Sequence, residues 1–320
     1  SDPKEPTQVG SIYIPGTVGG VYVEDKYAYI PDGNEGLAII DVSNPTKPAI
    51  VSQLDTQGTA YNVVVYNKYA YVADGTGGIV VFDVSNPAKP VQVGLYPAYD
   101  ARSVYVQRDY VYIADTKNGL VIATMNSVRK PSTNQIGWCD TAGTAVEIYI
   151  QGNYAYVADF DNGLVIIDIS DPKNPIQVGR YDTAGNAYGV YVQGNYAYVA
   201  DDENGLVILD ISNPIKPIQV GSAAGWASAV YVQGNYAYVA DYGNGLLIID
   251  ISDPKNPVRV GWCETYFACG VYVQGNYAYV ADYENGLVII DISDPKNPVR
   301  VGWHDTYRAY GVYVQGNYAY

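Results

Sequence analysis

The sequence predicts an all-β protein made of repeated four-stranded sheets, and three observations support this prediction. The chain of 320 residues repeats a unit of 40 to 44 residues. Residues 271–303 differ from residues 230–262 at only two positions. No segment shows the 3.6-residue apolar period of a helix, which excludes a helical solenoid. Four predicted strands in each unit favour a β-propeller, in which every unit forms one blade.

Each unit begins with a predicted hairpin. In the last complete unit, GVYVQG (270–275) and YAYVAD (277–282) are separated by a short Gly-Asn turn, which is typical of two-residue hairpin connections. The tyrosine that opens the second strand marks the repeat at Tyr27, Tyr69, Tyr110, Tyr154, Tyr196, Tyr236, Tyr277 and Tyr318.

The third strand, LVIIDI (287–292), is apolar on consecutive residues, so both of its faces are expected to be covered. We expect positive φ at the glycine before it, because this residue closes a hairpin loop. That glycine is present in all seven complete units, at Gly36, Gly78, Gly119, Gly163, Gly205, Gly245 and Gly286. The Pro-rich SDPKNP then predicts a loop, and VRVGW (299–303) is the fourth strand.

The two ends of the chain look like parts of one further blade. Residues 1–10 match the last loop and fourth strand of a unit, and residues 312–320 match its first strand and the start of its second. We therefore predict a single propeller domain over 1–320. It would have seven complete repeats of about 42 residues (about 21–311) and an eighth blade position split between 1–20 and 312–320. The alternative is a seven-bladed ring with overhanging ends. The split blade lacks about thirteen residues equivalent to VADYENGLVIIDI, so we expect a fragment of a longer repeat array.

GLVIID (163–168, 286–291) and GLVILD (205–210), each followed by ISDPKNP or ISNPIKP, resemble the LVIVD-repeat family over essentially the whole chain. The resemblance implies a β-propeller, often on secreted or cell-surface proteins of bacteria and archaea. It brings no established catalytic residues. The third unit departs from the pattern, because residues 119–137 have Thr124 in place of Asp and carry extra residues. One irregular blade edge is expected there.

Composition excludes several kinds of partner and chemistry. Eighteen basic and thirty-three acidic side chains give a net charge of −15, which disfavours nucleic acid and anionic membranes. No apolar run reaches the roughly 18 to 20 residues that cross a bilayer, so no direct membrane insertion is expected. His304 is the only histidine. With no polar constellation confined to one or two units, we predict that the protein is not an enzyme.

The segment that connects the fourth strand of one unit to the first strand of the next varies most between units. The end of the blades where these connections lie is the candidate binding surface. Relaxed selection on surface loops is the alternative explanation. Trp, Tyr and Arg dominate interface energetics, so aromatic residues of this segment are the candidate anchors. The candidate binding residues are Trp138, Trp226, Trp262, Tyr266, Phe267, Trp303, His304, Tyr307 and Arg308.

Carboxylates and cysteines lie at the same end of the blades. Asp159, Asp161, Asp201 and Asp282 are weak calcium candidates, but their spacing is not that of a calcium loop, and capping of turns is the favoured interpretation. No cofactor is therefore predicted. A second column of aspartates, such as Asp291, precedes the Pro-rich loop and is expected to fasten it. Cys263 and Cys269 could form a local disulfide in an oxidising compartment, with free thiols as the alternative.

These observations favour a non-catalytic extracellular or cell-surface propeller that binds a protein partner or assembles with copies of itself. The near-identical blades and the acidic, tyrosine-rich composition, with 35 tyrosines, support this hypothesis. Binding of a carbohydrate or another small ligand, at the variable loops or in a central channel, is the alternative.

Overall fold

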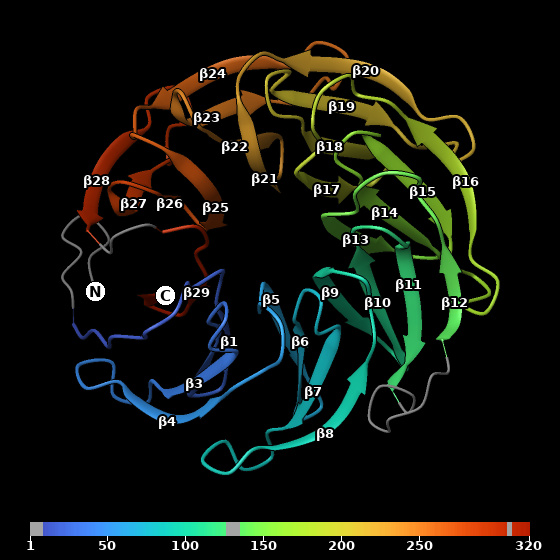
Figure 1. Ribbon diagram of the computed structural model, residues 1–320. Coiled ribbons are helices and arrows are strands. Elements are labelled where there is room, and N and C mark those ends of the chain that lie inside the picture. Colours follow the sequence, from blue (N-terminus) through green and yellow to red (C-terminus); the bar gives the residue numbers. More distant parts are fainter. Residues whose placement is uncertain (1–8, 126–134, 306–308) are drawn as a thin grey trace. The chain divides into compact units, whose positions relative to one another are not determined.

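The computed structural model describes residues 9–125, 135–305 and 309–320. The chain divides into two compact units, one containing residues 8–155 and 167–176 and the other residues 156–166 and 177–320. The described residues form seven four-stranded sheets and one two-stranded sheet (Figure 1). We call the four-stranded sheets blades 1 to 7 in chain order.

The first three blades belong to the first unit. Blade 1 contains β1 (Tyr22–Glu24), β2 (Tyr27–Pro31), β3 (Leu37–Asp41) and β4 (Ala49–Leu54). Blade 2 contains β5 (Asn62–Tyr66), β6 (Tyr69–Ala73), β7 (Ile79–Asp83) and β8 (Val91–Tyr96). Blade 3 contains β9 (Ala101–Gln107), β10 (Tyr110–Asp115), β11 (Gly119–Thr124) and β12 (Gln135–Cys139).

Blade 4 contributes residues to both units, and the remaining strands belong to the second. Blade 4 contains β13 (Glu147–Gln151), β14 (Tyr154–Ala158), β15 (Leu164–Asp168) and β16 (Ile176–Tyr181). Blade 5 contains β17 (Gly189–Gln193), β18 (Tyr196–Ala200), β19 (Leu206–Asp210) and β20 (Ile218–Ala223). Blade 6 contains β21 (Ala227–Gln233), β22 (Tyr236–Asp241), β23 (Gly245–Asp250) and β24 (Val258–Cys263). Blade 7 contains β25 (Ala268–Gln274), β26 (Tyr277–Asp282), β27 (Gly286–Asp291) and β28 (Val299–His304). A hairpin of β29 (Val314–Gln315) and β30 (Tyr318–Ala319) follows.

Each blade is an antiparallel meander whose strands pair in chain order, as in β17-β18-β19-β20. In blades 1, 2, 3, 5, 6 and 7 the third and fourth strands pair through a β-bulge. In blade 6 the register shifts between the pair Ile248 and Gly261 and the pair Ile249 and Arg259. Such a bulge increases the local twist of the outermost strand and makes edge-to-edge pairing with another sheet less favourable.

The hydrophobic core lies between adjacent blades. One cluster joins Leu206 and Ile208 of blade 5 to Val239 and Leu247 of blade 6, and a second joins blade 6 to blade 7 in the same way. The third strand contributes side chains to the core from both of its faces. In blade 5, for example, Leu206–Leu209 are all buried. The expectation that this strand is covered on both sides is therefore confirmed.

The glycine before each third strand has positive φ, as predicted. Its φ lies between 70° and 84° in all seven blades. In blade 6, a Cβ atom on Gly245 would also lie 2.5 Å from the carbonyl oxygen of Cys263 and 2.3 Å from the backbone nitrogen of Thr265. The glycine is therefore required by both backbone conformation and space.

A second glycine connects blades 3 to 6 to the blade that follows each of them, whereas blade 1 has Ser52 at this position, whose hydroxyl donates to the Pro87 carbonyl oxygen at 2.9 Å. In the fourth strand of blade 6, Gly261 lies against the Pro-rich loop of blade 7, where an added Cβ would be 2.2 Å from the Pro295 carbonyl oxygen. Gly221 makes the same contact with Pro254. The Pro-rich loop therefore has two roles: it connects the third and fourth strands, and it packs against the preceding blade.

Tyrosines of the first strands form a row across the last blades. The ring centroids of Tyr191 and Tyr231 are 5.4 Å apart, as are those of Tyr231 and Tyr272. Tyr272 and Tyr313 continue the row at 5.8 Å. Part of the high tyrosine content is thus explained by contacts between blades.

The preference for eight blade positions is wrong, and the seven-bladed alternative is correct. Residues 314–319 form only a two-stranded sheet, and residues 9–21 form no strand. The sequences at the two ends contain no counterpart of the third strand, which supplies the buried centre of every complete blade. Gly10 does lie against Pro45, the contact that a fourth-strand glycine makes with the next blade. The N-terminal match is therefore visible in packing but not as a blade.

Candidate functional site at the variable-loop end

A buried aspartate stands at the end of the second strand of every blade, and in blades 2, 3, 5, 6 and 7 it accepts a hydrogen bond from the variable loop that precedes the blade. These aspartates are fully buried: Asp32, Asp74, Asp115, Asp159, Asp201, Asp241 and Asp282. In blade 2, Asp74 accepts hydrogen bonds from the Thr56 hydroxyl and, at 2.8 Å, from the backbone N–H of Gly58. The same carboxylate thus joins the loop to the blade.

In blade 7 the buried aspartate binds both the variable loop and the adjacent hairpin. Asp282 accepts hydrogen bonds from the backbone N–H groups of Tyr266 at 2.7 Å and Phe267 at 2.9 Å. It also accepts from the N–H groups of Glu284 at 3.1 Å and Asn285 at 2.7 Å. Burial alone would raise the pKa of Asp282, but these backbone hydrogen bonds hold that pKa below its usual value.

Asp32 of blade 1 is the counterexample. Its Oδ1 atom is buried without a hydrogen-bond partner, and Gln53 donates to Oδ2 at 3.2 Å. Burial raises the pKa of Asp32 to about 6. Asp282 and Asp32 therefore differ in the hydrogen bonds that offset burial, although Asp74, which accepts two hydrogen bonds from its loop, also has a pKa raised by burial.

In blade 3 this end of the blade carries cations of the chain itself. The Lys117 ammonium lies 4.5 Å from the ring centroid of Tyr99. The Arg102 guanidinium lies 4.1 Å from the ring centroid of Tyr61 and forms an ion pair with Asp100 at 2.7 Å. These distances are those of cation–π contacts.

Over blades 6 and 7 the same end of the blades carries aromatic rings. The Phe267 ring lies 5.5 Å from Tyr242 and 6.3 Å from Tyr283, and Tyr283 lies 5.4 Å from Tyr310. Tyr266, beside this row, is 64% exposed, and Phe267 is 42% exposed. Burial raises the pKa of Tyr242 to about 12, so its phenol is neutral at physiological pH. The row presents uncharged aromatic surface.

The four candidate tryptophans are not equivalent, although each is more than half exposed. Trp138, Trp262 and Trp303 lie at the same register of a fourth strand, paired with the third-strand residues Val121, Leu247 and Val288. Trp226 instead lies in the loop before β21, where its backbone N–H donates to Asp241 at 2.6 Å. The structure thus separates three outer-strand tryptophans from the loop.

The remaining predicted residues are dispersed. His304 ends β28 opposite Leu287, while Tyr307 and Arg308 lie outside the described residues. Cys263 and Cys269 are free thiols, so the disulfide between them is not formed in this structure. The Cys269 thiol points to the Phe267 carbonyl at 3.6 Å, and burial raises its pKa to about 11.

The calcium candidates are not brought together. Asp159, Asp201 and Asp282 lie in three different blades and are buried, and Asp161 is exposed. Within residues 9–125, 135–305 and 309–320, no three His, Cys, Asp or Glu side chains are grouped closely enough to hold a metal ion.

The aspartates before the Pro-rich loop fasten it, as predicted. Asp291 accepts a hydrogen bond from the backbone N–H of Ser293 at 3.0 Å, and Asp250 accepts one from Ser252 at 2.9 Å.

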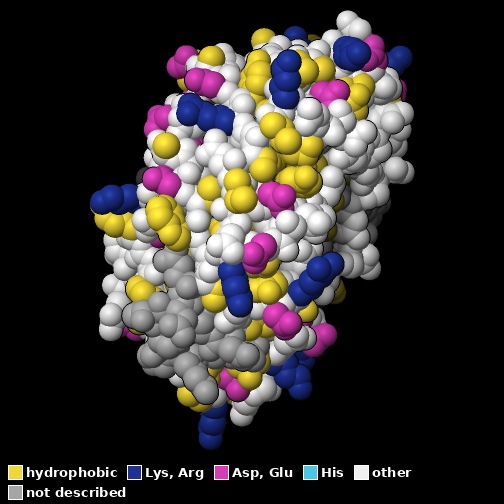
Figure 2. Space-filling model, turned by 90° about the vertical axis from the view of Figure 1, so that its right-hand side faces the viewer, with side chains coloured by type: hydrophobic (Ala, Val, Ile, Leu, Met, Phe, Trp, Pro, Cys, Tyr) yellow, Lys and Arg dark blue, Asp and Glu magenta, His cyan; other side chains and the backbone are white. Residues whose placement is uncertain are grey.

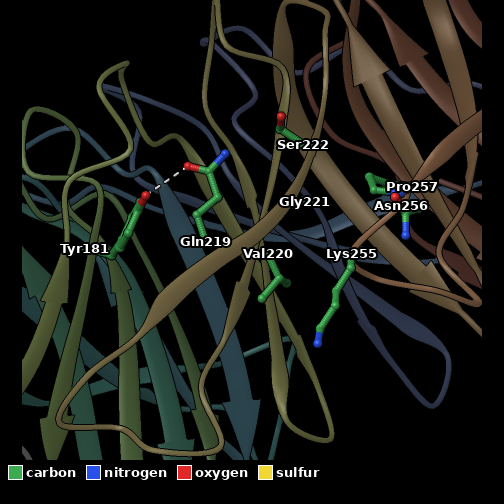
Figure 3. Close-up of a pocket in the computed structure, with 8 residues that line it drawn as sticks. All are labelled: Tyr181, Gln219, Val220, Gly221, Ser222, Lys255, Asn256 and Pro257. Carbon is green, nitrogen blue, oxygen red and sulfur yellow. Dashed lines mark hydrogen bonds between the residues drawn. The ribbon is translucent and has the colours of Figure 1, made fainter.

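The described residues form at least two open grooves on the surface. The first is lined by Tyr181, Gln219, Val220, Gly221, Ser222, Lys255, Asn256 and Pro257 (Figure 3). In it, the Tyr181 hydroxyl donates to the Gln219 carbonyl oxygen at 3.0 Å. The second surrounds Tyr99, Asp100, Arg102 and Lys117 at the variable-loop end of blade 3. On the face drawn in Figure 2, basic and acidic side chains are interspersed with hydrophobic ones.

Sequence reasoning did not single out the cations of blade 3. The predicted site omits Tyr99, Arg102 and Lys117, because it was defined by the aromatic content of the loops. Aligning the loops on their buried alanine, Ala101 in blade 3 and Ala268 in blade 7, places Arg102 against Cys269 and would have shown the difference.

Solved structures share this fold at low sequence identity. The computationally designed Ika8 protein is 7% identical, with a TM-score of 0.76, over 94% of this chain and 92% of that chain. BamB from Moraxella catarrhalis is 14% identical, with a TM-score of 0.71, over 98% and 93% of the two chains. Apo AztD from Citrobacter koseri is 13% identical, with a TM-score of 0.63, over 92% and 87%. No curated protein matches the sequence.

The seven four-stranded blades define a β-propeller. The LVIVD repeat model matches residues 15–56, 57–97, 98–123, 142–183, 184–223, 224–265 and 267–306. The chain therefore belongs to the LVIVD-repeat family, as its sequence motifs predicted. In the part of the chain that the structure describes, no helix is long and apolar enough to cross a membrane.

Proposed function

We propose that this propeller is a non-catalytic protein-interaction module, extracellular or at the cell surface, and that it contacts its partner through the variable-loop end of blades 6 and 7. One observation carries the proposal. Two N–H groups of the blade 7 loop and two of the adjacent hairpin donate to buried Asp282 and fix the loop backbone, while Tyr266 and Phe267 remain exposed. Aromatic side chains on a fixed backbone lose little conformational entropy on binding, which favours recognition.

A second copy of the chain is the first partner to test. Sedimentation velocity over a concentration series should show assembly of the wild-type chain and loss of assembly in Tyr266→Ala/Phe267→Ala. Ile215→Ala is the matched control, because Ile215 is 72% exposed but lies in a Pro-rich loop, at the other end of the blade. Equal assembly of all three proteins contradicts the proposal for self-association.

A different protein partner would be identified by affinity purification from the source organism with the same three proteins as baits. A partner captured by the wild type and by Ile215→Ala, but not by the double variant, is the expected result. A partner lost only from Ile215→Ala would place the binding surface at the other end of the blades.

The proposal includes the absence of catalytic activity. It is supported by the single histidine and by the engagement of the second-strand carboxylate of blade 7 with backbone N–H groups. A broad hydrolase and oxidoreductase screen is expected to give no turnover. A turnover that disappears when one exposed carboxylate, such as Glu284, is replaced would contradict this part.

Carbohydrate binding is the second candidate, favoured by the exposed outer-strand tryptophans, since exposed indole rings are common contact surfaces for apolar ligand faces. Arg259 and Arg300 lie 5.8 and 5.4 Å from the ring centroids of Trp262 and Trp303. A glycan array with the wild type and Trp262→Ala/Trp303→Ala tests this candidate. Binding that the double variant retains would exclude these tryptophans.

A further inference from the structure

The loop of blade 3 shows how the chain positions a cation over an aromatic ring. The backbone N–H groups of Tyr99 and Lys117 donate to the two carboxylate oxygens of Asp115, at 2.7 and 3.2 Å. This arrangement fixes the two backbones relative to each other. The Lys117 ammonium then lies 4.5 Å from the Tyr99 ring centroid.

Blade 7 repeats this backbone arrangement with a different side chain. The N–H groups of Tyr266 and Glu284 donate to the two oxygens of Asp282, at 2.7 and 3.1 Å. Residue 284 of blade 7 is therefore equivalent to Lys117 of blade 3, and Tyr266 is equivalent to Tyr99. At this position blade 7 has a carboxylate in place of the ammonium group.

The neighbouring backbone contact is matched as well. The N–H of Thr116 donates to the Asp100 carbonyl at 3.1 Å in blade 3, and the N–H of Tyr283 donates to the Phe267 carbonyl at 2.8 Å in blade 7. Where blade 3 has a charged side chain, Asp100, blade 7 has an aromatic ring, Phe267. The two loops share a backbone and differ in chemistry.

The Tyr266 ring has no cation of the chain over it within the described residues, although the Lys117 counterpart position lies beside it. The Tyr266 side chain is 64% exposed. Glu284, whose backbone N–H shares the Asp282 carboxylate with that of Tyr266, and Glu264, two residues before Tyr266, are exposed. An exposed tyrosine ring beside carboxylates attracts a cation through both the ring quadrupole and the charge.

We propose that Tyr266 and Glu284 form a subsite for a lysine or arginine side chain of a partner protein, which takes the place that Lys117 occupies over Tyr99 in blade 3. The inference rests on the proposed function, since it names the partner's chemistry at the same surface. The exposed ring of Phe267 extends the subsite and provides contact for the apolar stem of the cationic side chain. The net charge of −15 steers basic segments toward the chain but does not by itself select this position.

The test uses a fluorescein-labelled peptide of alternating glycine and arginine, with a glycine–citrulline peptide as the neutral isostere. Fluorescence anisotropy at low ionic strength should show binding of the arginine peptide only. Glu284→Lys supplies an internal cation for Tyr266 and should weaken binding about tenfold. Tyr266→Leu, which keeps an apolar side chain without an aromatic ring, should weaken binding by a similar factor.

Two charge-matched variants separate the subsite from general attraction to an acidic protein. Glu35→Lys makes the same charge change at an exposed position of the blade 1 hairpin and should change the affinity less than about twofold. Lys117→Glu uncovers Tyr99 and should strengthen binding about threefold. Equal weakening by Glu284→Lys and Glu35→Lys, or equal binding of the citrulline peptide, would overturn the inference.

The two proposals fail in different ways. If the arginine peptide does not bind, while Tyr266→Ala/Phe267→Ala still abolishes assembly or partner capture, the cation subsite is wrong and the interaction surface stands. If the peptide binds as expected but the double variant assembles and captures partners normally, the subsite exists but the proposed function is wrong.

Discussion

Blades 3 and 7 differ at their variable-loop ends in a way that separates framework from chemistry. Asp115 and Asp282 each accept hydrogen bonds from the same two backbone positions, one in the loop and one in the hairpin. In blade 3 the exposed tyrosine is covered by the chain's own ammonium group, whereas in blade 7 the equivalent position is Glu284. The buried aspartate therefore sets the loop backbone, and the exposed side chains on that backbone can change independently.

The largest effect is expected from removing the shared framework. Asp282→Ala leaves four loop and hairpin N–H groups without their acceptor and should lower the free energy of unfolding by about 3 kcal/mol. Asp115→Ala should act similarly if the two frameworks are equivalent. Urea unfolding measures both, with Asp161→Ala, an exposed carboxylate, as the control.

The effect of Asp282 should also depend on pH. Its folded-state pKa is held below the usual value, so its stabilisation is present above about pH 4 and is lost as the pH falls through the folded-state pKa. The difference between wild type and Asp282→Ala should therefore shrink in acid. A difference that stays constant between neutral and acidic pH would mean that the carboxylate charge is not what holds the loop.

Asp32 provides the opposite case, with a smaller effect. Its folded-state pKa of about 6 means that ionisation disfavours the folded state, a cost absent below about pH 4 and complete above about pH 6. Asp32→Asn should therefore stabilise the protein by about 1 kcal/mol at pH 7, after allowance for solvent screening. Melting temperatures at pH 7 and pH 4 check this, and a gain that persists at pH 4 would contradict it.

The cation over Tyr99 should contribute less. A double-mutant cycle of Lys117→Ala and Tyr99→Leu is expected to give a coupling energy of about 0.5 kcal/mol, the magnitude of an exposed cation–π contact. The same cycle of Glu284→Ala and Tyr266→Leu in blade 7 should give no favourable coupling. Equal coupling energies in the two blades would mean that Lys117 does not distinguish the Tyr99 site from the Tyr266 site.

The smallest effect concerns the turn between the first two strands. Arg108 has a φ of 56° in blade 3, where blade 7 has Gly275 with a φ of 60°. Arg108→Gly should stabilise the protein by about 0.4 kcal/mol, because relief of left-handed strain slightly exceeds the entropic cost of glycine. Gly275→Arg should be correspondingly unfavourable, since a Cβ there meets no neighbouring atom and only strain changes. Chemical denaturation of the two variants measures this, and effects of the same sign would contradict it.

Much of the fold could be predicted because its determinants are local in sequence. Gly286 before a third strand, Asp291 before a Pro-rich loop and the apolar run of residues 287–290 each have a short-range physical reason, and each recurs. The number of blades could not be predicted in the same way. Matching the two ends to parts of a unit suggested an eighth blade, but a blade requires a third strand buried on both faces.

The candidate site was predicted only in part for a related reason. Aromatic content singled out Tyr266 and Phe267, and both are exposed loop residues; their role in binding stays a prediction. The relation between Tyr99 and Lys117 depends on two N–H groups that share one buried carboxylate, and no periodicity in the sequence reports that geometry. Likewise, the outer-strand position of Trp262 becomes evident only from its pairing with Leu247.

The contact between a fourth-strand glycine and the Pro-rich loop of the next blade has an evolutionary consequence. Gly261 meets Pro295 across blades 6 and 7, and Gly221 meets Pro254 across blades 5 and 6. Blade 6 therefore carries one half of the contact with its predecessor, Pro254, and one half of the contact with its successor, Gly261. An in-frame duplication of such a unit copies both halves, so the copy can pack against its neighbours through the same contacts. A gene built this way can lengthen by unequal crossing-over while its exposed loops diverge, as the near-identical strands and dissimilar loops of blades 6 and 7 illustrate.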